Sequence, residues 1–183
     1  LSITIIFIML YQELCEMYAD LEKNQSRLKK VELLAAFLKK LKKNEENDII
    51  YLLQGKVFPD YSEKELGISE KLVIKALAKS WGITNGEIVS YWKKFGDLGM
   101  VAEHITSKKR QNTLFSVRLS VKKVLENLQR LPTLEGNGAV EKKLSLICEL
   151  LAPAGALEAK YIVRTLLVDL RVGVAAGTMR DAI

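Results

Sequence analysis

The chain has 183 residues and a mass of 20.6 kDa, and 49% of its residues are hydrophobic, which is enough for the core of one sizeable domain. This composition excludes disorder over most of the chain. The 28 Lys and Arg residues against 22 Asp and Glu give a net charge of +6, which favours a polyanionic partner. The alternative is a basic surface that contacts only water. The positions of the charges must distinguish between these two interpretations.

Cysteine and histidine are scarce. Cys15 and Cys148 lie far apart, each within an apolar helical pattern, which argues against a disulfide framework or a cysteine zinc site. His104 is the only histidine, so no histidine metal cluster can form, and we interpret it as structural. We therefore expect a reducing, cytoplasmic setting and no metal site.

The first ten residues form an apolar run about half as long as a bilayer requires, with no basic flank before it. They predict neither a transmembrane helix nor a signal peptide, and we expect no membrane partner. The amphipathic pattern starts afresh at Met9. We therefore expect residues 1–8 to be an upstream or non-native extension and residues 9–183 to form the domain.

Helical periodicity runs through the first half of the chain. Apolar residues at helical spacing predict helices over residues 10–21, 26–43, 48–53, 69–81 and 86–95. Short polar side chains mark two of the starts, since Ser69 can cap the fourth helix and Thr84 or Asn85 the fifth. A tight turn is expected over residues 96–99, ahead of Met100.

The second half of the chain is also helical in pattern. It predicts helices over residues 120–131, 140–151 and 156–168, the last of which is the last clear helix. Ser120 can cap the first of these helices, and Pro132 stops it. Residues 106–119 are the least regular, and their alternation over 114–119 indicates an extended piece. The pattern predicts an all-α fold in a single multi-helix domain.

No motif of a known active site is present. The chain lacks a Gly-x-x-x-x-Gly-Lys-Ser/Thr loop, a Gly-x-Gly-x-x-Gly motif, His-Glu-x-x-His and Gly-x-Ser-x-Gly. Glu63, Glu65 and Glu70 could in principle hold Mg²⁺, but lysines flank them, and we interpret them as solvated charges. Catalysis by this chain is not expected.

The best candidate for a binding site follows the last predicted helix. Arg171 is followed by Gly173 and by the small residues Ala175, Ala176 and Gly177. Arginine can donate two hydrogen bonds to a phosphate, and backbone N–H groups at a glycine turn can donate others. Small residues would let the segment lie flat in a minor groove. The alternative, that Gly173 only caps the preceding helix, fits the spacing equally well.

Three weaker candidates are also basic. Arg27 lies at a predicted helix start, where the dipole favours anions, although ordinary N-capping explains the polar residues before it. Lys142 and Lys143 follow a Gly-Asn-Gly loop and could bind phosphate together with first-turn amides. The basic run over residues 108–110 could follow a phosphate backbone, but a solvated loop is the commoner role of such a run.

Four stretches of the chain make a specific combination. They are residues 26–28, 96–103, 136–143 and 158–174, the last containing Glu-Ala-Lys-Tyr-Ile-Val-Arg-Thr-Leu and then Leu-Arg-Val-Gly-Val. In this order they resemble the N-terminal DNA-binding domain of ATP-dependent DNA ligases of the archaeal and eukaryotic replicative type. The resemblance covers residues 9–183. It implies an all-helical domain that grips duplex DNA on both sides of a nick through the minor groove, largely without sequence readout.

The resemblance also implies roles for single residues. It assigns a phosphate contact to Arg27 and a minor-groove loop to Arg171, Gly173 and Ala175. The complete set of predicted DNA-binding residues is Arg27, Lys143, Arg164, Arg171, Gly173 and Ala175. Asp169 departs from the family, which usually has a glycine near this position. A carboxylate beside phosphates is unfavourable unless it points away.

Family members ligate through a lysine-adenylate at a Lys-x-Asp-Gly motif, which this chain lacks. The resemblance thus implies an N-terminal fragment, truncated at its C-terminal end and inactive alone, of an ATP- and Mg²⁺-dependent ligase of replication, repair and recombination. Its expected partners are nicked duplex DNA, the remaining ligase domains and a sliding clamp, and the chain itself is expected to hold no cofactor. Two other interpretations stay open, a helical protein-interaction scaffold and an RNA-binding helical module.

Overall fold

The computed structural model describes residues 9–41, 46–109 and 118–183, which fold into ten α-helices. Within these ranges there is no strand, only an isolated antiparallel bridge between Leu10 and Ser120, and no helix is both long and apolar enough to cross a membrane. The predicted all-α fold is confirmed. Residues 1–8, predicted to be an extension, lie outside the described ranges, as does most of the predicted extended piece over 114–119.

The helices and their bounds, in chain order, are α1 (Tyr11–Lys23), α2 (Arg27–Leu38), α3 (Glu46–Leu53), α4 (Glu70–Trp81), α5 (Asn85–Phe95), α6 (Leu98–Lys109), α7 (Val121–Arg130), α8 (Ala139–Leu151), α9 (Ala156–Leu166) and α10 (Ala176–Ala182). A short 3₁₀ helix, η2 (Leu131–Thr133), follows α7. Pro132 lies within this short helix, and α7 ends just before it, as predicted.

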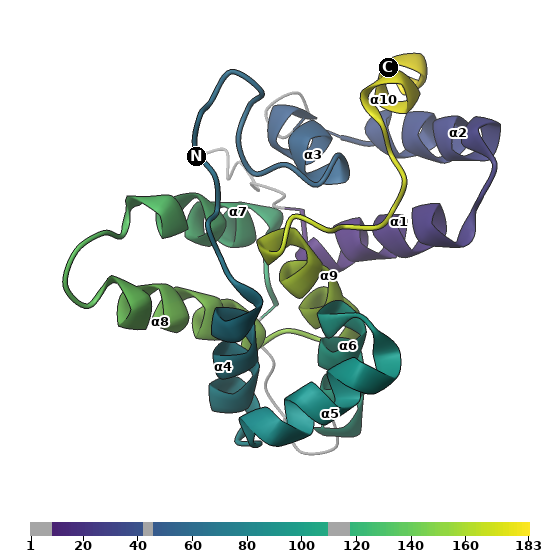
Figure 1. Ribbon diagram of the computed structural model, residues 1–183. Helices are drawn as coiled ribbons and strands as arrows, with labels where there is room; N and C mark the ends of the chain where they lie inside the picture. The colour runs from purple at the N-terminus through teal and green to yellow at the C-terminus, as the bar shows by residue number, and fades with distance from the viewer. Residues whose placement is uncertain (1–8, 42–45, 110–117) are drawn as a thin grey trace, which may run out of the picture.

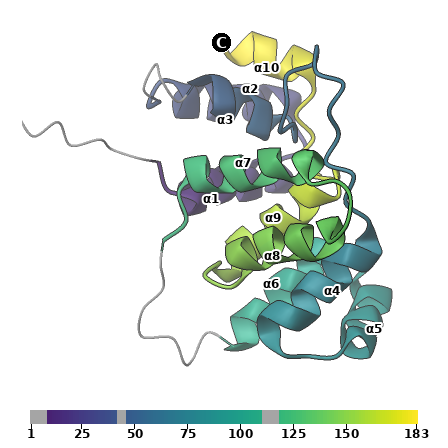
Figure 2. The ribbon, with the colours of Figure 1, turned by 90° about the vertical axis from the view of Figure 1, so that its left-hand side faces the viewer.

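Helix α9 is the centre of the molecule. All its residues from Glu158 to Leu166 are buried, and α1, α6 and α8 pack directly against it. Helices α4 and α5 lie with α6 at one end of the molecule, and α2, α3 and α10 lie at the other (Figures 1 and 2). One buried helix thus holds the two ends together.

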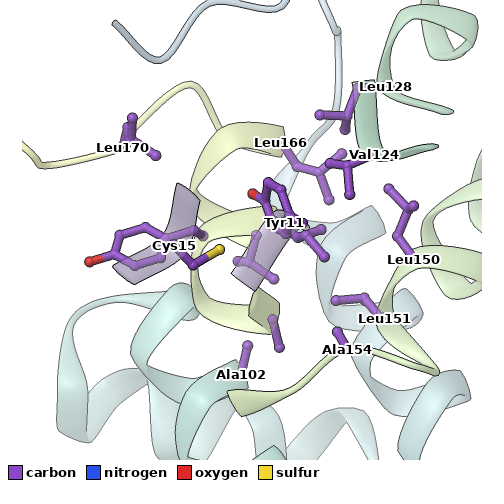
Figure 3. Packing of buried hydrophobic residues seen from close by; sticks show 14 of the residues in the cluster. Tyr11, Cys15, Ala102, Val124, Leu128, Leu150, Leu151, Ala154, Leu166 and Leu170 are labelled. Carbon is purple, nitrogen blue, oxygen red and sulfur yellow. The ribbon is translucent and has the colours of Figure 1, made fainter. Parts of the chain in front are cut away.

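Two tyrosines of α1 anchor the core around α9. Tyr11 and Tyr18 are both fully buried, and Figure 3 shows Tyr11 among side chains of α7, α8 and α9. The hydroxyl of Tyr18 donates to the carbonyl oxygen of Leu52 in α3 at 2.8 Å, and its ring centroid lies 4.9 Å from that of Tyr161 in α9. The buried hydroxyl is therefore satisfied, and α1 connects α3 to the central helix.

The predicted caps are formed. The side chains of Ser69 and Ser120 accept the backbone N–H of the third residue that follows each, at 3.3 and 3.1 Å. Thr84, and not Asn85, caps α5, because its hydroxyl and the Glu87 carboxylate exchange hydrogen bonds with each other's backbone N–H groups. This reciprocal capping box fixes the start of α5.

The turn predicted over residues 96–99 is wrong from Leu98 onward. Helix α6 begins at Leu98 and continues to Lys109, into the region predicted to be irregular. The carboxylate of Asp97 accepts the N–H of Gly99 at 2.7 Å, so it satisfies a first-turn donor of the helix. Asp and Gly favour turns and helix starts alike, and the sequence did not separate the two.

Helix α10 was not predicted. It has seven residues, mostly small, which make no clear apolar stripe. It packs along α2 and buries Thr178, Met179 and Ala182. A helix this short is not stable alone and depends on packing. The chain reaches α10 through a linker, because α9 ends at Leu166, before its predicted end.

Gly99 lies where α6 meets α9. A Cβ at this position would come within 2.7 Å of Arg164 Cγ and 2.9 Å of the Lys160 carbonyl oxygen. We expect Gly99→Ala to lower the free energy of unfolding by about 1–3 kcal/mol, because the two helices would have to separate. Urea denaturation measures this change.

Gly86→Ala in α5 is the matched control, since the nearest atom to its Cβ would be Thr84 Oγ1 at 3.9 Å. This variant should be neutral or more stable by up to about 1 kcal/mol. Equal losses in the two variants would contradict the close approach of α6 and α9.

Candidate nucleic-acid interface

The start of α2 and residues 169–182 lie side by side, as both views show (Figures 1 and 2). The Lys30 ammonium donates to the carbonyl oxygen of Val172 at 2.7 Å, across 142 positions of sequence. Arg27 forms an ion pair with Asp181 of α10. We call Arg27, Lys30 and residues 169–182 the α2–α10 surface. It brings together two of the sites that the sequence predicted separately.

The linker from α9 to α10 presents Arg171 by burying its two neighbours. Leu170 and Val172 are 7% and 3% exposed, whereas the Arg171 side chain is 46% exposed. Arg171 has φ 59°, a left-handed conformation that residues other than glycine rarely adopt. The chain therefore turns at Arg171, with an apolar anchor on each side.

Gly173 does not cap α9, which ends at Leu166, so that alternative is excluded. Gly173 has φ 65°, and a Cβ there would come within 2.5 Å of the Lys30 ammonium. A side chain there would meet the flexible end of Lys30, which contacts the linker carbonyls. Gly173, Ala175 and Ala176 are all exposed, so a stretch of backbone with small side chains lies open beside Arg171.

The α2–α10 surface contains two basic residues that the sequence reasoning missed. Arg180 is exposed on α10, and a Cβ on Gly177 would lie 3.6 Å from Arg27 Nη2 and 3.9 Å from Arg180 Nη2. The two guanidinium groups thus flank the same glycine. Lys30 could have been found one helical turn after Arg27, but Arg180 belongs to a helix that was not predicted.

Both exposed arginines predicted to contact DNA are paired with carboxylates. Arg171 Nε and Nη2 each lie 2.7 Å from Asp169 Oδ2, and Nη1 lies 3.5 Å from Asp97 Oδ2. The hydrogen bond that Arg171 donates to Asp169 raises the pKa of the guanidinium. Arg27 and Asp181 keep 63% and 45% of their side chains exposed. Asp169 therefore faces an arginine.

Arg164 does not lie on the α2–α10 surface. It is 3% exposed, and its Nε and Nη2 donate to Asp97 Oδ2 at 3.0 and 2.6 Å. Its Nη1 and Nη2 donate to the Glu22 carboxylate at 3.0 and 3.1 Å. The guanidinium of Arg164, which the sequence predicted to contact DNA, therefore points into the protein and away from the surface that Arg27 and Arg171 share. Its charge is buried and already satisfied by two carboxylates inside the protein.

These carboxylates are ionised at neutral pH. Burial acts to raise the pKa of Glu22, but hydrogen bonds from Arg164 and Tyr161 outweigh it, and the pKa falls to about 2. Burial likewise opposes ionisation of Asp97, and the hydrogen bond from Arg164 overcomes it and lowers that pKa. For Arg164 itself, burial is offset by Glu22 and Asp97, which raise its pKa. The group is a buried, hydrogen-bonded ion cluster.

Lys143 lies apart from this surface. Its helix, α8, packs against α4, α7 and α9, and both views place α8 away from α2 and α10 (Figures 1 and 2). From the other basic run, Lys108 lies with its ammonium 5.5 Å from the centroid of the Tyr91 ring, and Arg110 is outside the described residues. Lys143 and Lys108 are therefore not part of the α2–α10 surface.

No metal site is found in the part of the chain that the structure describes, where no group of three or more His, Cys, Asp or Glu side chains could hold an ion. These residues do not fit the Mg²⁺ that the resemblance implies for the parent ligase. The centroid of the His104 ring lies 5.0 Å from that of Tyr91 and 5.1 Å from that of Phe95. These contacts agree with the interpretation of His104 as a structural residue.

The fold and the α2–α10 surface define a helical domain with a basic edge. A family model described as DNA ligase N terminus matches residues 10–183. Because the match covers nearly the whole chain, the chain belongs to the family of DNA ligase N-terminal domains, and the resemblance stated from the motifs is confirmed.

Curated relatives agree with this assignment. The chain is 43% identical over 175 residues to a DNA ligase of Methanothermobacter thermautotrophicus, which covers 96% of this chain and 31% of that protein. It is 41% identical over 176 residues to a DNA ligase of Methanosphaera stadtmanae, with 94% and 32% covered. For a DNA ligase of Thermococcus fumicolans the identity is 40% over 175 residues, with 96% and 31% covered. The chain spans about a third of the length of these relatives.

The ion cluster predicts how stability depends on pH. We expect Arg164→Met to lower the free energy of unfolding at pH 7 by about 3–5 kcal/mol, because two carboxylates lose their buried partner. The pKa values of Glu22 and Asp97 are depressed in the folded state. Their contribution is therefore present above their unfolded pKa values of about 4 and is lost as the pH falls toward about 2.

Urea unfolding of the wild type and of Arg164→Met between pH 7 and pH 2.5 measures this dependence. The difference between the two proteins should shrink across the acidic range. Arg130→Met changes an exposed arginine of α7 in the same way and should have little effect at any pH. A constant difference between wild type and Arg164→Met would contradict the role of the carboxylates.

Proposed function

We propose that this chain binds duplex DNA without sequence readout, through phosphate and minor-groove contacts of the α2–α10 surface. The proposal is carried by one observation, the convergence of four basic residues from distant parts of the sequence on one edge of the molecule. They are Arg27, Lys30, Arg171 and Arg180. The net charge of +6 acts in the same direction.

The chemistry of the surface suits a duplex backbone. Arginine donates paired hydrogen bonds to phosphate oxygens, and such contacts fix position on a duplex without reading its sequence. The minor groove of B-DNA is only about 6 Å wide, so protein backbone enters it where side chains are small. Gly173, Ala175 and Ala176 supply such a stretch beside Arg171.

Family membership favours DNA over other polyanions. The relatives are named DNA ligases, and we propose that the whole protein seals nicks in an ATP- and Mg²⁺-dependent reaction during replication, repair and recombination. In that protein this domain would hold and position the nicked duplex. The remaining ligase domains and a sliding clamp are proposed partners, and the proposed setting is the intracellular one of chromosomal DNA.

Lys143 is proposed as a separate phosphate contact. It lies just after the first turn of α8, whose N-cap Gly138 offers no side chain to the helix amides. Because α8 is away from α2 and α10, only a duplex that passes both places could use both contacts. Lys143→Ala should then weaken binding to a long duplex and leave binding to a short one unchanged, as measured by fluorescence anisotropy. An equal effect on both lengths would argue against a separate contact.

The main test is binding of the chain to nicked, intact and single-stranded DNA over a salt series. If about five phosphates are neutralised, log K should fall against log salt with a slope near −4.5. Arg171→Ala should weaken binding equally on unrelated sequences and make the slope shallower by up to about one. Fluorescence anisotropy measures both quantities.

Lys93→Ala is the matched control, because it removes one exposed positive charge from α5, at the other end of the molecule. It should change affinity little. No binding to duplex DNA by the folded chain would instead favour a protein-interaction scaffold, and tighter binding to duplex RNA would favour an RNA-binding module, because the A-form minor groove is wide and shallow.

A further inference from the structure

We propose that the carboxylates of Asp169 and Asp181 bind Arg171 and Arg27 at the positions that DNA phosphates would take. By competing with the phosphates, they lower the affinity of the domain for DNA. This inference rests on the proposed function. It concerns two carboxylates that make the surface bind less tightly than its four basic residues alone would allow.

The geometry at Arg171 is that of a bound oxyanion. Two nitrogens of the guanidinium, Nε and Nη2, lie 2.7 Å from the same oxygen of Asp169, and the third lies 3.5 Å from Asp97. A phosphate oxygen prefers the same donors at the same distances. A phosphate that binds Arg171 must therefore take the place of the Asp169 carboxylate.

The arrangement at Arg27 repeats this feature on the other side of the surface. Arg27 Nη2 donates to Asp181 Oδ2, which α10 brings to α2 from 154 positions away in the sequence. Each exposed arginine predicted to bind DNA thus has an acidic partner within the surface. Lys30 is bound differently, by linker carbonyls, and that contact joins the linker to α2.

Both carboxylates are exposed enough to water that a phosphate can replace them. The side chains of Asp169 and Asp181 are 52% and 45% exposed, so they can return to water when a phosphate replaces them. The partners of Arg164 differ, since Asp97 is 6% exposed and Glu22 is 30% exposed. Burial keeps the Arg164 pairs intact while the exposed pairs open.

Such an exchange has a signature in the salt dependence. A basic side chain that is free releases counterions from DNA when it binds. When an arginine must first leave a carboxylate to bind a phosphate, the freed carboxylate attracts cations from solution. The net number of counterions released on binding is then smaller. The surface should therefore bind more weakly, and with a shallower salt slope, than its number of basic residues implies.

The test compares Asp169→Asn and Asp181→Asn with Glu126→Gln, by fluorescence anisotropy on one nicked duplex across a salt series. Glu126 is the matched control because it is an exposed carboxylate, paired with Lys122 at 3.8 Å, on α7. Each Asp variant should bind about two- to five-fold more tightly than the wild type, with a slope steeper by up to about one. Glu126→Gln should change both quantities less. An equal increase in affinity in all three variants would overturn the proposal, since it would reflect the change in net charge alone.

Arg171→Ala separates this inference from the proposed function. When Arg171 is already replaced by alanine, Asp169→Asn should raise the affinity for DNA no more than Glu126→Gln does, because Asp169 then has no arginine to bind. If Arg171→Ala weakens binding but Asp169→Asn gains no more than the control, the inference fails and the proposed function stands. If neither Arg171→Ala nor Arg27→Ala changes the binding of the folded protein to DNA, both fail.

Discussion

Arg164 joins three parts of the chain through one buried guanidinium. It binds Glu22 of α1 and Asp97 at the start of α6, and its Nη1 lies 3.5 Å from the carbonyl oxygen of Leu170. The central helix is thereby connected to two of its neighbours and to the linker. Because Asp97 also lies 3.5 Å from Arg171, the buried cluster ends at the α2–α10 surface.

The three arginines that the sequence predicted to bind DNA, Arg27, Arg164 and Arg171, differ in burial and in role. Arg164 is enclosed with Asp97, so removing either of them would leave a buried charge without its main partner. Arg27 and Arg171 form pairs that water reaches, and such pairs contribute little to folding. The same chemistry, an arginine with an aspartate, therefore stabilises the fold in one place and leaves a replaceable contact in another. Sequence motifs do not distinguish these roles, because both kinds of arginine are part of them.

Local patterns predicted local structure well. The Ser69 and Ser120 caps and most helices followed from spacing and short-range hydrogen bonds, which depend on neighbours in the sequence. The α2–α10 surface depends on a contact across 142 positions, and the short helix α10 depends on its packing against α2, so no local pattern contained either. The ion pairs of Arg164 could not be predicted for a related reason, since its partners lie 67 and 142 positions away.

The most direct measurement is an NMR titration of the isotope-labelled chain with a short nicked duplex. Because the duplex is proposed to bind at the α2–α10 surface, the amides of the α2 start and of residues 169–182 should shift most, and those of α5 should shift least. The result that would contradict it is a saturable set of shifts centred on α4 and α5, with the α2 start and the linker unchanged.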